Sequence, residues 1–171
     1  MPLWSKFFPM GLIDTHTHLE SFARQGVLAD VLARARAAGV DAMITIGTSP
    51  EDWRTYQEIA RGHPGFVHYT VGLHPCAVEA YWGDGVGQLE AFWGKSGEGR
   101  EATLPVALGE CGLDRFHLPR DVAEADRIFA WQRGAFAAQL EMAKRLGCPV
   151  VVHSRDAFRE CVAMIDESGV D

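Results

Sequence analysis

The sequence lacks the excess of basic residues that proteins use to grip nucleic acid broadly along its backbone. Its 16 Lys and Arg residues are outnumbered by 23 Asp and Glu residues, which gives a formal net charge of −7. Broad electrostatic binding depends on clustered Lys and Arg, so the composition argues against it. An anionic substrate remains compatible with this charge, because a bound metal ion can reverse the sign of the field locally.

Paired cysteines and long apolar runs are also absent. The four cysteines form no CxxC pair and do not have the spacing of a small secreted domain, which predicts reduced thiols and a cytoplasmic location. No apolar run reaches the roughly 20 residues of a membrane-spanning helix, so we expect no membrane partner. We interpret residues 1–10 as an N-terminal extension and residues 11–171 as one domain.

Several common catalytic motifs are missing as well. The chain contains no GxGxxG or GxxxxGK[ST] phosphate-binding loop and no GxSxG nucleophile elbow. Cys111 has no obvious activating partner, and we expect it to fill space in the core.

What the sequence does contain is a regular alternation of apolar runs and helical patterns. Strands are predicted over residues 12–13, 40–46, 66–73, 106–111 and 149–152. Helices are predicted over about residues 27–39, 49–62, 86–93, 122–146 and 157–167, with residues 21–25 as a short connection. Strands that are apolar throughout are typical of parallel strands covered on both faces. The pattern predicts an α/β fold, either an open doubly wound sheet or a (β/α) barrel.

The stretch LIDTHTHL, residues 12–19, places two histidines two positions apart after a short strand expected to be buried. Residues i and i+2 of a strand face the same side, so His16 and His18 can point at one spot. Asp14 is in step with them and can orient a ligand imidazole. Two neutral imidazoles suit a borderline divalent ion such as zinc. The alternative is a pair of surface histidines at a strand end.

Further polar residues fall at the ends of the other predicted strands. His74 follows the third strand, Glu110 closes the fourth and His153 closes the fifth. Such ends share one rim of a parallel sheet or barrel, which favours a metal site over chance placement. A carboxylate within an apolar strand needs a partner, and we predict that Glu110 bridges two ions, with a buried arginine as the alternative partner. His153 is a candidate ligand of the second ion or a satisfied core histidine.

Other residues near this rim are assigned supporting roles. Arg155 shares the face of His153 and can grip a phosphate oxygen, unless it is a solvent-exposed arginine. Asp114 and His74 suit orientation of a ligand or contact with substrate better than ligation. We therefore count Glu110 and Asp114 as catalytic and His74 and Arg155 as substrate-binding residues. The three remaining histidines are predicted to be structural or solvated: His63, His68 and His117.

Four ordered stretches resemble the TatD family of metal-dependent hydrolases: LIDTHTHL at 12–19, VGLHP at 71–75, ALGECGLD at 107–114 and VVVHSRDA at 150–157. The resemblance implies a TIM-like (β/α) barrel, two divalent metal ions (zinc, magnesium or manganese) and hydrolysis of phosphodiester bonds in DNA. It implies His16 and His18 as ligands of one ion, Glu110 as the bridging carboxylate and His153 as a ligand of the other ion.

The sequence departs from the family pattern in two respects. Cys76 stands where the family commonly has a second histidine after the His-Pro of strand three, and the chain holds about five of the eight barrel units. A further histidine and a late aspartate of the family's ligand set have no counterpart here. We expect a truncated barrel that is part of a longer protein or pairs with another chain, for example by self-association through its open edges. The alternatives are an amidohydrolase-like ester or amide hydrolase and a catalytically silent binding module.

Overall fold

A computed structural model of the chain describes residues 11–94 and 104–170. It contains one parallel sheet with the strand order β1-β2-β3-β4-β5. The strands are β1 (Leu12–Thr17), β2 (Val40–Thr45), β3 (Val67–Val71), β4 (Ala107–Asp114) and β5 (Val150–Arg155). The helices are α1 (Glu20–Arg24), α2 (Leu28–Ala37), α3 (Pro50–Gly62), α4 (Trp82–Leu89), α5 (Val122–Leu146) and α6 (Phe158–Ser168), with 3-10 turns η2 (Pro75–Ala77) and η3 (Glu90–Trp93).

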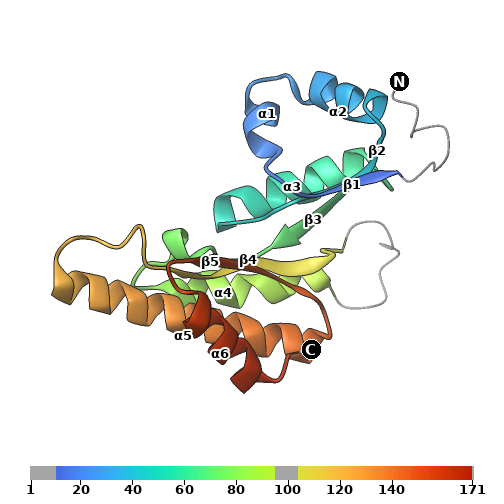
Figure 1. The fold of residues 1–171 in the computed structure, drawn as a ribbon. Coiled ribbons are helices and arrows are strands. Elements are labelled where there is room, and N and C mark those ends of the chain that lie inside the picture. Colours follow the sequence, from blue (N-terminus) through green and yellow to red (C-terminus); the bar gives the residue numbers. More distant parts are fainter. Residues whose placement is uncertain (1–10, 95–103, 171) are drawn as a thin grey trace, which may run out of the picture.

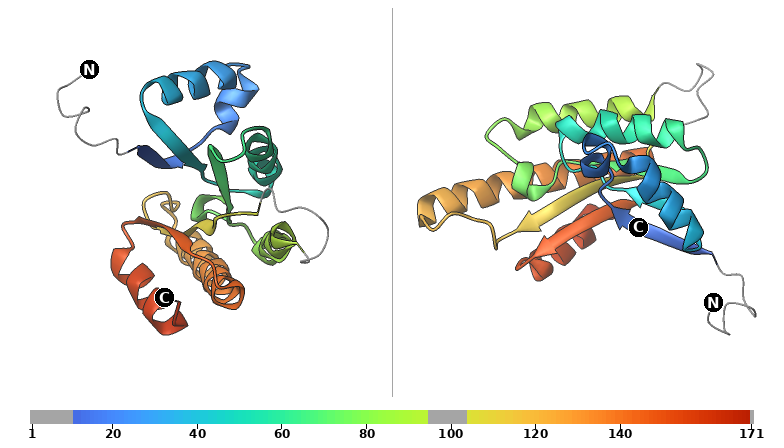
Figure 2. Two further views of the ribbon diagram at one scale, coloured as in Figure 1. Left: turned by 90° about the vertical axis from the view of Figure 1, so that its right-hand side faces the viewer. Right: turned by 90° about the horizontal axis from the view of Figure 1, so that it is seen from above.

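The sheet curls into an open half-barrel with the helices along its outer side (Figures 1 and 2). This confirms the α/β prediction and the incomplete TIM-like barrel. Each strand pairs in parallel with the next strand in the sequence, as a (β/α) barrel requires. No helix in the described ranges has both the length and the apolar character needed to cross a bilayer.

The predicted order of elements is confirmed, but several boundaries differ. Residues 21–25 were expected to be a connection, yet α1 occupies most of them. The Tyr56 hydroxyl donates a hydrogen bond to Glu20, and Phe22 packs on the core, so tertiary contacts hold this short helix. Strands β4 and β5 also continue past Glu110 and His153, because their pairing extends over the next residues of both strands. The prediction that these two residues close their strands was therefore wrong.

Gly109 and Gly112 allow β4 and β5 to approach closely on either side of Glu110. Their φ angles are +129° and +147°. A Cβ at Gly109 would overlap the carbonyl oxygen of Val151, and one at Gly112 would overlap that of His153. Only glycine fits both the backbone conformation and the space, and this approach sets Glu110 beside β5.

Gly109→Ala is expected to lower the free energy of unfolding by about 2–4 kcal/mol. The energetic cost of placing alanine at a positive φ adds to the cost of the overlap between its Cβ and β5. Gly87→Ala in α4 is the matched control: a Cβ there meets nothing within 4 Å, so stability should stay unchanged or rise by about 0.5–1 kcal/mol. Urea denaturation of both variants measures the difference. Wild-type stability in Gly109→Ala would show that the close approach is not needed.

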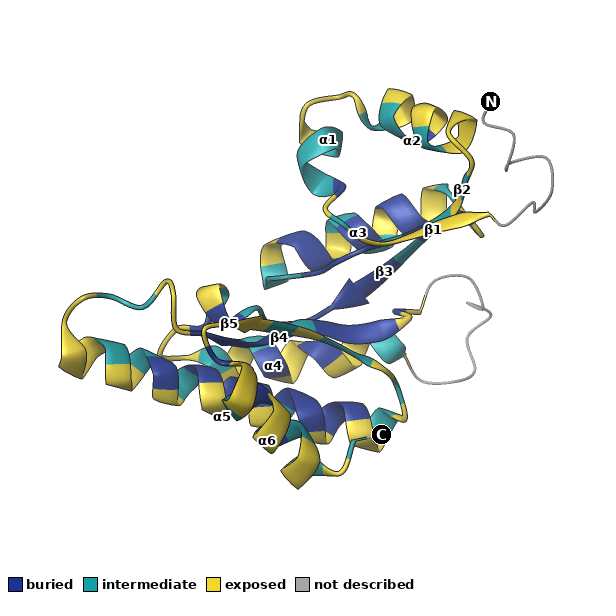
Figure 3. Cartoon of the chain, in the orientation of Figure 1, coloured by how far each residue is buried: buried dark blue, intermediate teal, exposed yellow. Residues whose placement is uncertain are grey.

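The core lies between the curled sheet and the helices on its outer side (Figure 3). Its largest fully buried side chains include Trp53 and Tyr56 of α3, Tyr69 of β3 and Phe136 of α5. Strands β3 and β4 are covered on both faces, as predicted.

Strands β1 and β5 depart from this expectation. Leu12 and Ile13 of β1 are 60% and 63% exposed, and Val152 of β5 is 37% exposed. The prediction of a buried first strand was therefore wrong. The physical reason is that β1 and β5 are the edges of an unclosed sheet, where no further described strand covers the apolar side chains.

Candidate metal centre

Glu110, in the middle of β4, stands at the centre of the candidate site. Its side chain is 12% exposed, and its backbone N–H donates to the Gly47 carbonyl after β2, with a nitrogen–oxygen distance of 2.8 Å. The Gly47 N–H in turn donates to the buried Thr70 hydroxyl on β3. Hydrogen bonds across three strands thus fix the position of this carboxylate.

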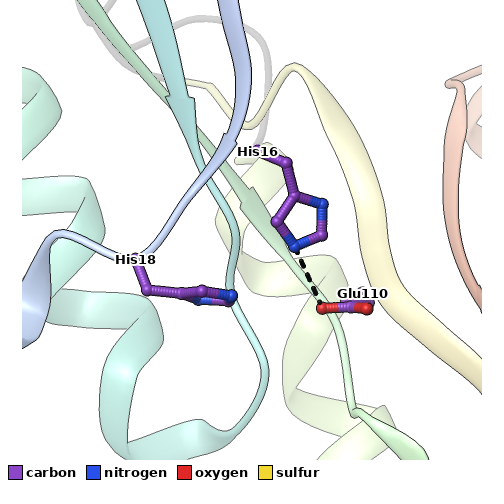
Figure 4. A group of neighbouring side chains, drawn as sticks. All are labelled: His16, His18 and Glu110. Atoms are coloured by element: carbon purple, nitrogen blue, oxygen red, sulfur yellow. Dashed lines mark ion pairs between the residues drawn. The ribbon is translucent and has the colours of Figure 1, made fainter.

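The first group of candidate ligands joins β1 to Glu110. His16 Nε2 lies 3.5 Å from Glu110 Oε2. The His18 ring stands edge-on to His16 with ring centroids 5.3 Å apart, and both rings are directed toward Glu110 (Figure 4). One ligand atom from each of the three residues fits within 4.8 Å of the others. The His16 side chain is 47% exposed, so an ion can reach this group from solvent.

The second group shares the same carboxylate from its other oxygen. His153 Nδ1 of β5 lies 3.1 Å from Glu110 Oε1, and His74 Nε2 lies 3.9 Å from it. The two imidazoles also approach each other, with His74 Nε2 3.0 Å from His153 Nδ1. Glu110 therefore belongs to two ligand groups at once, as a bridging carboxylate must.

The hydrogen-bond network assigns the protons of the second group. The Cys76 backbone N–H donates to His74 Nδ1 at 3.1 Å, which leaves the proton of a neutral His74 ring on Nε2. His153 Nε2 lies 3.0 Å from Asp114 Oδ2 and donates to that carboxylate, which leaves His153 Nδ1 unprotonated. With these tautomers the His74 Nε2–H donates to His153 Nδ1 at 3.0 Å, and Glu110 Oε1 lies 3.1 Å from the same nitrogen. A cation between His153 Nδ1 and Glu110 Oε1 would replace the hydrogen bond from His74.

The local environment supports these protonation states. Burial, with a smaller contribution from the neighbouring His153 imidazole, lowers the pKa of His74 to about 4, so the His74 ring is neutral near pH 7. Burial alone would raise the pKa of Asp114, but hydrogen bonds from His117, His153 and Cys76 hold the pKa of this carboxyl below its ordinary range. Asp114 is therefore a fixed anion that orients His153, an arrangement common behind metal-ligating histidines.

Other predicted residues lie differently from expectation. The Arg155 guanidinium stacks 3.8 Å above the Phe116 ring on the surface and joins neither ligand group. Asp14 accepts the backbone N–H of His16, not an imidazole N–H, so it shapes the strand end. His117 was expected to be structural or solvated. Its ring is 52% exposed, but Nδ1 lies 2.8 Å from Asp114 Oδ2.

Two glutamines that were not predicted from the sequence bind backbone groups next to the candidate ligands. Gln139 of α5 is fully buried; its Oε1 accepts the Leu73 N–H at 2.8 Å and its Nε2 donates to the Leu73 carbonyl at 3.1 Å. Gln132 lies seven residues earlier on the same helix, and its Oε1 accepts the Asp114 N–H at 3.0 Å. The sequence does contain a sign of these two residues: two amide side chains, seven residues apart, interrupt the apolar stripe of a helix.

Gln139→Leu is expected to cost about 1–3 kcal/mol of stability, because it leaves the buried N–H and carbonyl of Leu73 unpaired. Exposed Gln88 is the matched control, since Gln88→Leu removes only a surface hydrogen bond and should change stability by less than about 0.5 kcal/mol. Thermal and urea unfolding report both effects. Equal costs for the two variants would refute a bracing role for Gln139.

The chain is similar to known proteins of one family. A family profile described as TatD related DNase matches residues 13–171. The chain is 42% identical over 129 residues to the 3'-5' ssDNA/RNA exonuclease TatD of Rahnella sp., covering 74% of this chain and 43% of that protein. It is 31% identical over 157 residues to the protein of the same name from Edwardsiella piscicida, covering 90% of this chain and 54% of that protein.

Two solved structures have a similar fold. The crystal structure of a TatD homologue from Escherichia coli K12 superposes with a TM-score of 0.75 and 28% identity, covering 95% of this chain and 58% of that chain. A TatD-family hydrolase from Entamoeba histolytica has the same fold, with a TM-score of 0.67 and 20% identity, covering 93% of this chain and 55% of that chain. The chain spans about half the length of the curated relatives it matches.

Proposed function

Because the chain belongs to the TatD-related DNase family, we propose that it carries the metal centre of a two-metal hydrolase that cleaves phosphodiester bonds in DNA. One observation carries this proposal: two groups of candidate ligands share the carboxylate of Glu110. A carboxylate between two ions about 3.5–4 Å apart is a recurring feature of two-metal phosphoesterases.

We assign the ligands by the Glu110 oxygen that each one approaches. His16 and His18 would hold one ion together with Oε2, and His153 would hold the other together with Oε1. Imidazole donors favour zinc over magnesium, and the shared carboxylate is also compatible with manganese. Two divalent ions, when bound, would polarise the phosphodiester, lower the pKa of an attacking water and neutralise charge on the leaving oxygen.

The other residues of the site would act on substrate or on a ligand. The His74 Nε2–H donates to His153 Nδ1 in this structure. With an ion at His153 Nδ1 this proton would be released from that bond, and we assign it to donation toward a phosphate oxygen. Asp114 would contribute to catalysis by fixing the His153 ring through Nε2. Arg155 lies on the surface over Phe116, where its charge can attract the phosphate backbone.

A direct assay tests the proposal. The purified chain is incubated with labelled single-stranded DNA and with Mg²⁺, Mn²⁺ or Zn²⁺, beside panels of ester and amide substrates. We expect metal-dependent release of nucleotides. Turnover of amides or carboxylic esters alone would favour an amidohydrolase-like enzyme. Metal binding without turnover of any substrate would favour a catalytically silent binding module.

We also propose that two copies associate through the open edge at β1. Leu12 and Ile13 are more than half exposed there, and β1 pairs with β2 alone among the described strands. Ile13→Lys is expected to convert a dimer into a monomer, because a charged side chain on an exposed edge strand disfavours pairing with a second copy. Val122→Lys is the control, since Val122 is a 72% exposed residue on α5, away from that edge. Sedimentation velocity measures both variants, and a monomeric wild-type chain at micromolar concentration would refute the association.

A further inference from the structure

A third group of candidate ligands lies beyond the two that share Glu110. Cys76 belongs to turn η2, Asp114 is the last residue of β4 and His117 follows it in the next loop. Cys76 Sγ lies 3.5 Å from Asp114 Oδ2 and 3.6 Å from His117 Nδ1, and His117 Nδ1 lies 2.8 Å from Asp114 Oδ2. The three atoms form a compact triangle at the surface.

We propose that Cys76, Asp114 and His117 form a third cation site of the zinc type, separate from the two ligand groups at Glu110. Thiolate, carboxylate and imidazole are the three side-chain ligands that zinc takes, and a catalytic-type site uses three protein ligands and leaves one position open. With bonds of about 2.0–2.3 Å, ligand atoms of a tetrahedral zinc ion lie about 3.3–3.8 Å apart. The two distances from Cys76 Sγ fall in that range, and the shorter one widens by a small rotation of the His117 ring.

The surroundings hold two of these ligands in place before any ion binds. Asp114 is fully buried, its N–H donates to Gln132 Oε1 at 3.0 Å, and its Oδ1 accepts the His117 backbone N–H at 2.9 Å. The Cys76 backbone is held by its N–H bond to His74 Nδ1. Cys76 and His117 are exposed, so an ion can enter from solvent without rearrangement of the core.

Sulfur distinguishes this site chemically from the other two groups. A thiolate selects zinc over magnesium and manganese, whereas the groups at Glu110 contain only nitrogen and oxygen donors. Without an ion, the thiol and the His117 Nδ1–H both donate to Asp114 Oδ2. On binding, the thiol proton is released to solvent and the imidazole proton moves to Nε2. One proton therefore leaves for each ion bound.

The site is connected to the rest of the centre through one carboxylate. Asp114 Oδ2 also accepts the His153 Nε2–H at 3.0 Å, and His153 faces Glu110 through its other nitrogen. A cation bound at Cys76 and His117 would therefore act on His153 through Asp114. Cys76 stands where the family commonly has a histidine, and in this site it supplies a soft sulfur ligand.

Cobalt(II) titration of the chain tests the proposal, because a thiolate–cobalt charge-transfer band reports only sulfur ligation. We expect this band to saturate at one equivalent, to disappear in Cys76→Ser, and to need at least about tenfold more cobalt in His117→Ala. Cys148→Ser and His63→Ala are the matched controls and should keep the wild-type band. Glu110→Gln should also keep it, so this test is separate from that of the hydrolase.

Two results would overturn the proposal. One is a wild-type chain that binds cobalt without any thiolate band, which would leave the three residues as a hydrogen-bonded brace. The other is a band that survives Cys76→Ser, which would assign the sulfur to another cysteine. Circular dichroism of each variant verifies that it is folded, and calorimetry in two buffers of different ionisation enthalpy should count one released proton per zinc ion.

Discussion

Replacement of Glu110 by Gln is expected to lower metal-dependent DNA hydrolysis by at least about 10³-fold, comparable to the loss of a principal electrostatic contributor to a transition state. The amide keeps the shape of the side chain, but it has no charge and cannot bridge two cations. His16, His74 and His153 all lie within 3.9 Å of the Glu110 oxygens, so every one of them loses its anionic partner. Single-turnover rates on end-labelled DNA at saturating Mn²⁺ measure the effect.

Glu90→Gln is the matched control for this variant. Glu90 is an exposed carboxylate that pairs with Arg145 on the surface, 2.8 Å away, and such a pair contributes at most about 1 kcal/mol. We expect its rate within about twofold of wild type. A wild-type rate in Glu110→Gln, from protein purified in parallel with the control, would remove Glu110 from the mechanism.

Zinc is expected to stabilise the chain strongly through the ligands around Glu110. At a zinc concentration of about 100 times Kd, binding adds about 2.7 kcal/mol to the free energy of unfolding, which corresponds to about 5–10 °C in Tm for a chain of this size. His16→Ala and His18→Ala together should remove most of this shift. The measurement is differential scanning calorimetry in the Cys76→Ser background, so that the sulfur-containing site does not contribute.

His63→Ala is the control for that series, because His63 lies at the end of α3, outside all three ligand groups. It should keep the full zinc-induced shift in Tm, and a chelator should abolish the shift. An equal shift in the His16/His18 double variant and in wild type would place the bound zinc elsewhere.

The sequence predicted the fold through its hydrophobic pattern and the site through strand ends. The helix expected over residues 122–146 has those bounds, with an Asp121 N-cap and Gly147 at its end in the left-handed conformation. His16, His18, Glu110 and His153 come together around the Glu110 carboxylate as expected, although Glu110 and His153 lie within β4 and β5 and not at the ends of these strands. Both inferences rest on local periodicity, which one sequence displays directly.

What the sequence did not reveal depends on contacts between distant residues. Gln132 and Gln139 interrupt the apolar stripe of α5, and only the packed structure shows that they bind backbone near His74 and Asp114. Arg155 shares a strand with His153, but its guanidinium stacks on Phe116. The alternation of side chains along a strand does not predict this contact. The exposure of Ile13 likewise follows from the unclosed sheet and not from the residue itself.

The same reasoning explains why the third ligand group was missed. His117 lies off the strand-end pattern, and Cys76 was noted as the loss of a histidine. Their meeting at Asp114 depends on the loop after β4 folding back toward η2, with the His117 N–H bonded to Asp114 Oδ1. No spacing rule in the sequence predicts that return.

The central claim is that Glu110 is shared by two cations. Anomalous diffraction at the zinc edge, from crystals of the chain grown with zinc, tests it most directly. The account predicts two peaks, one on each side of the Glu110 carboxylate and each about 2.0–2.2 Å from one of its oxygens, with His16 and His18 at one and His153 at the other. Zinc bound to the chain with no peak within coordination distance of Glu110 would contradict it.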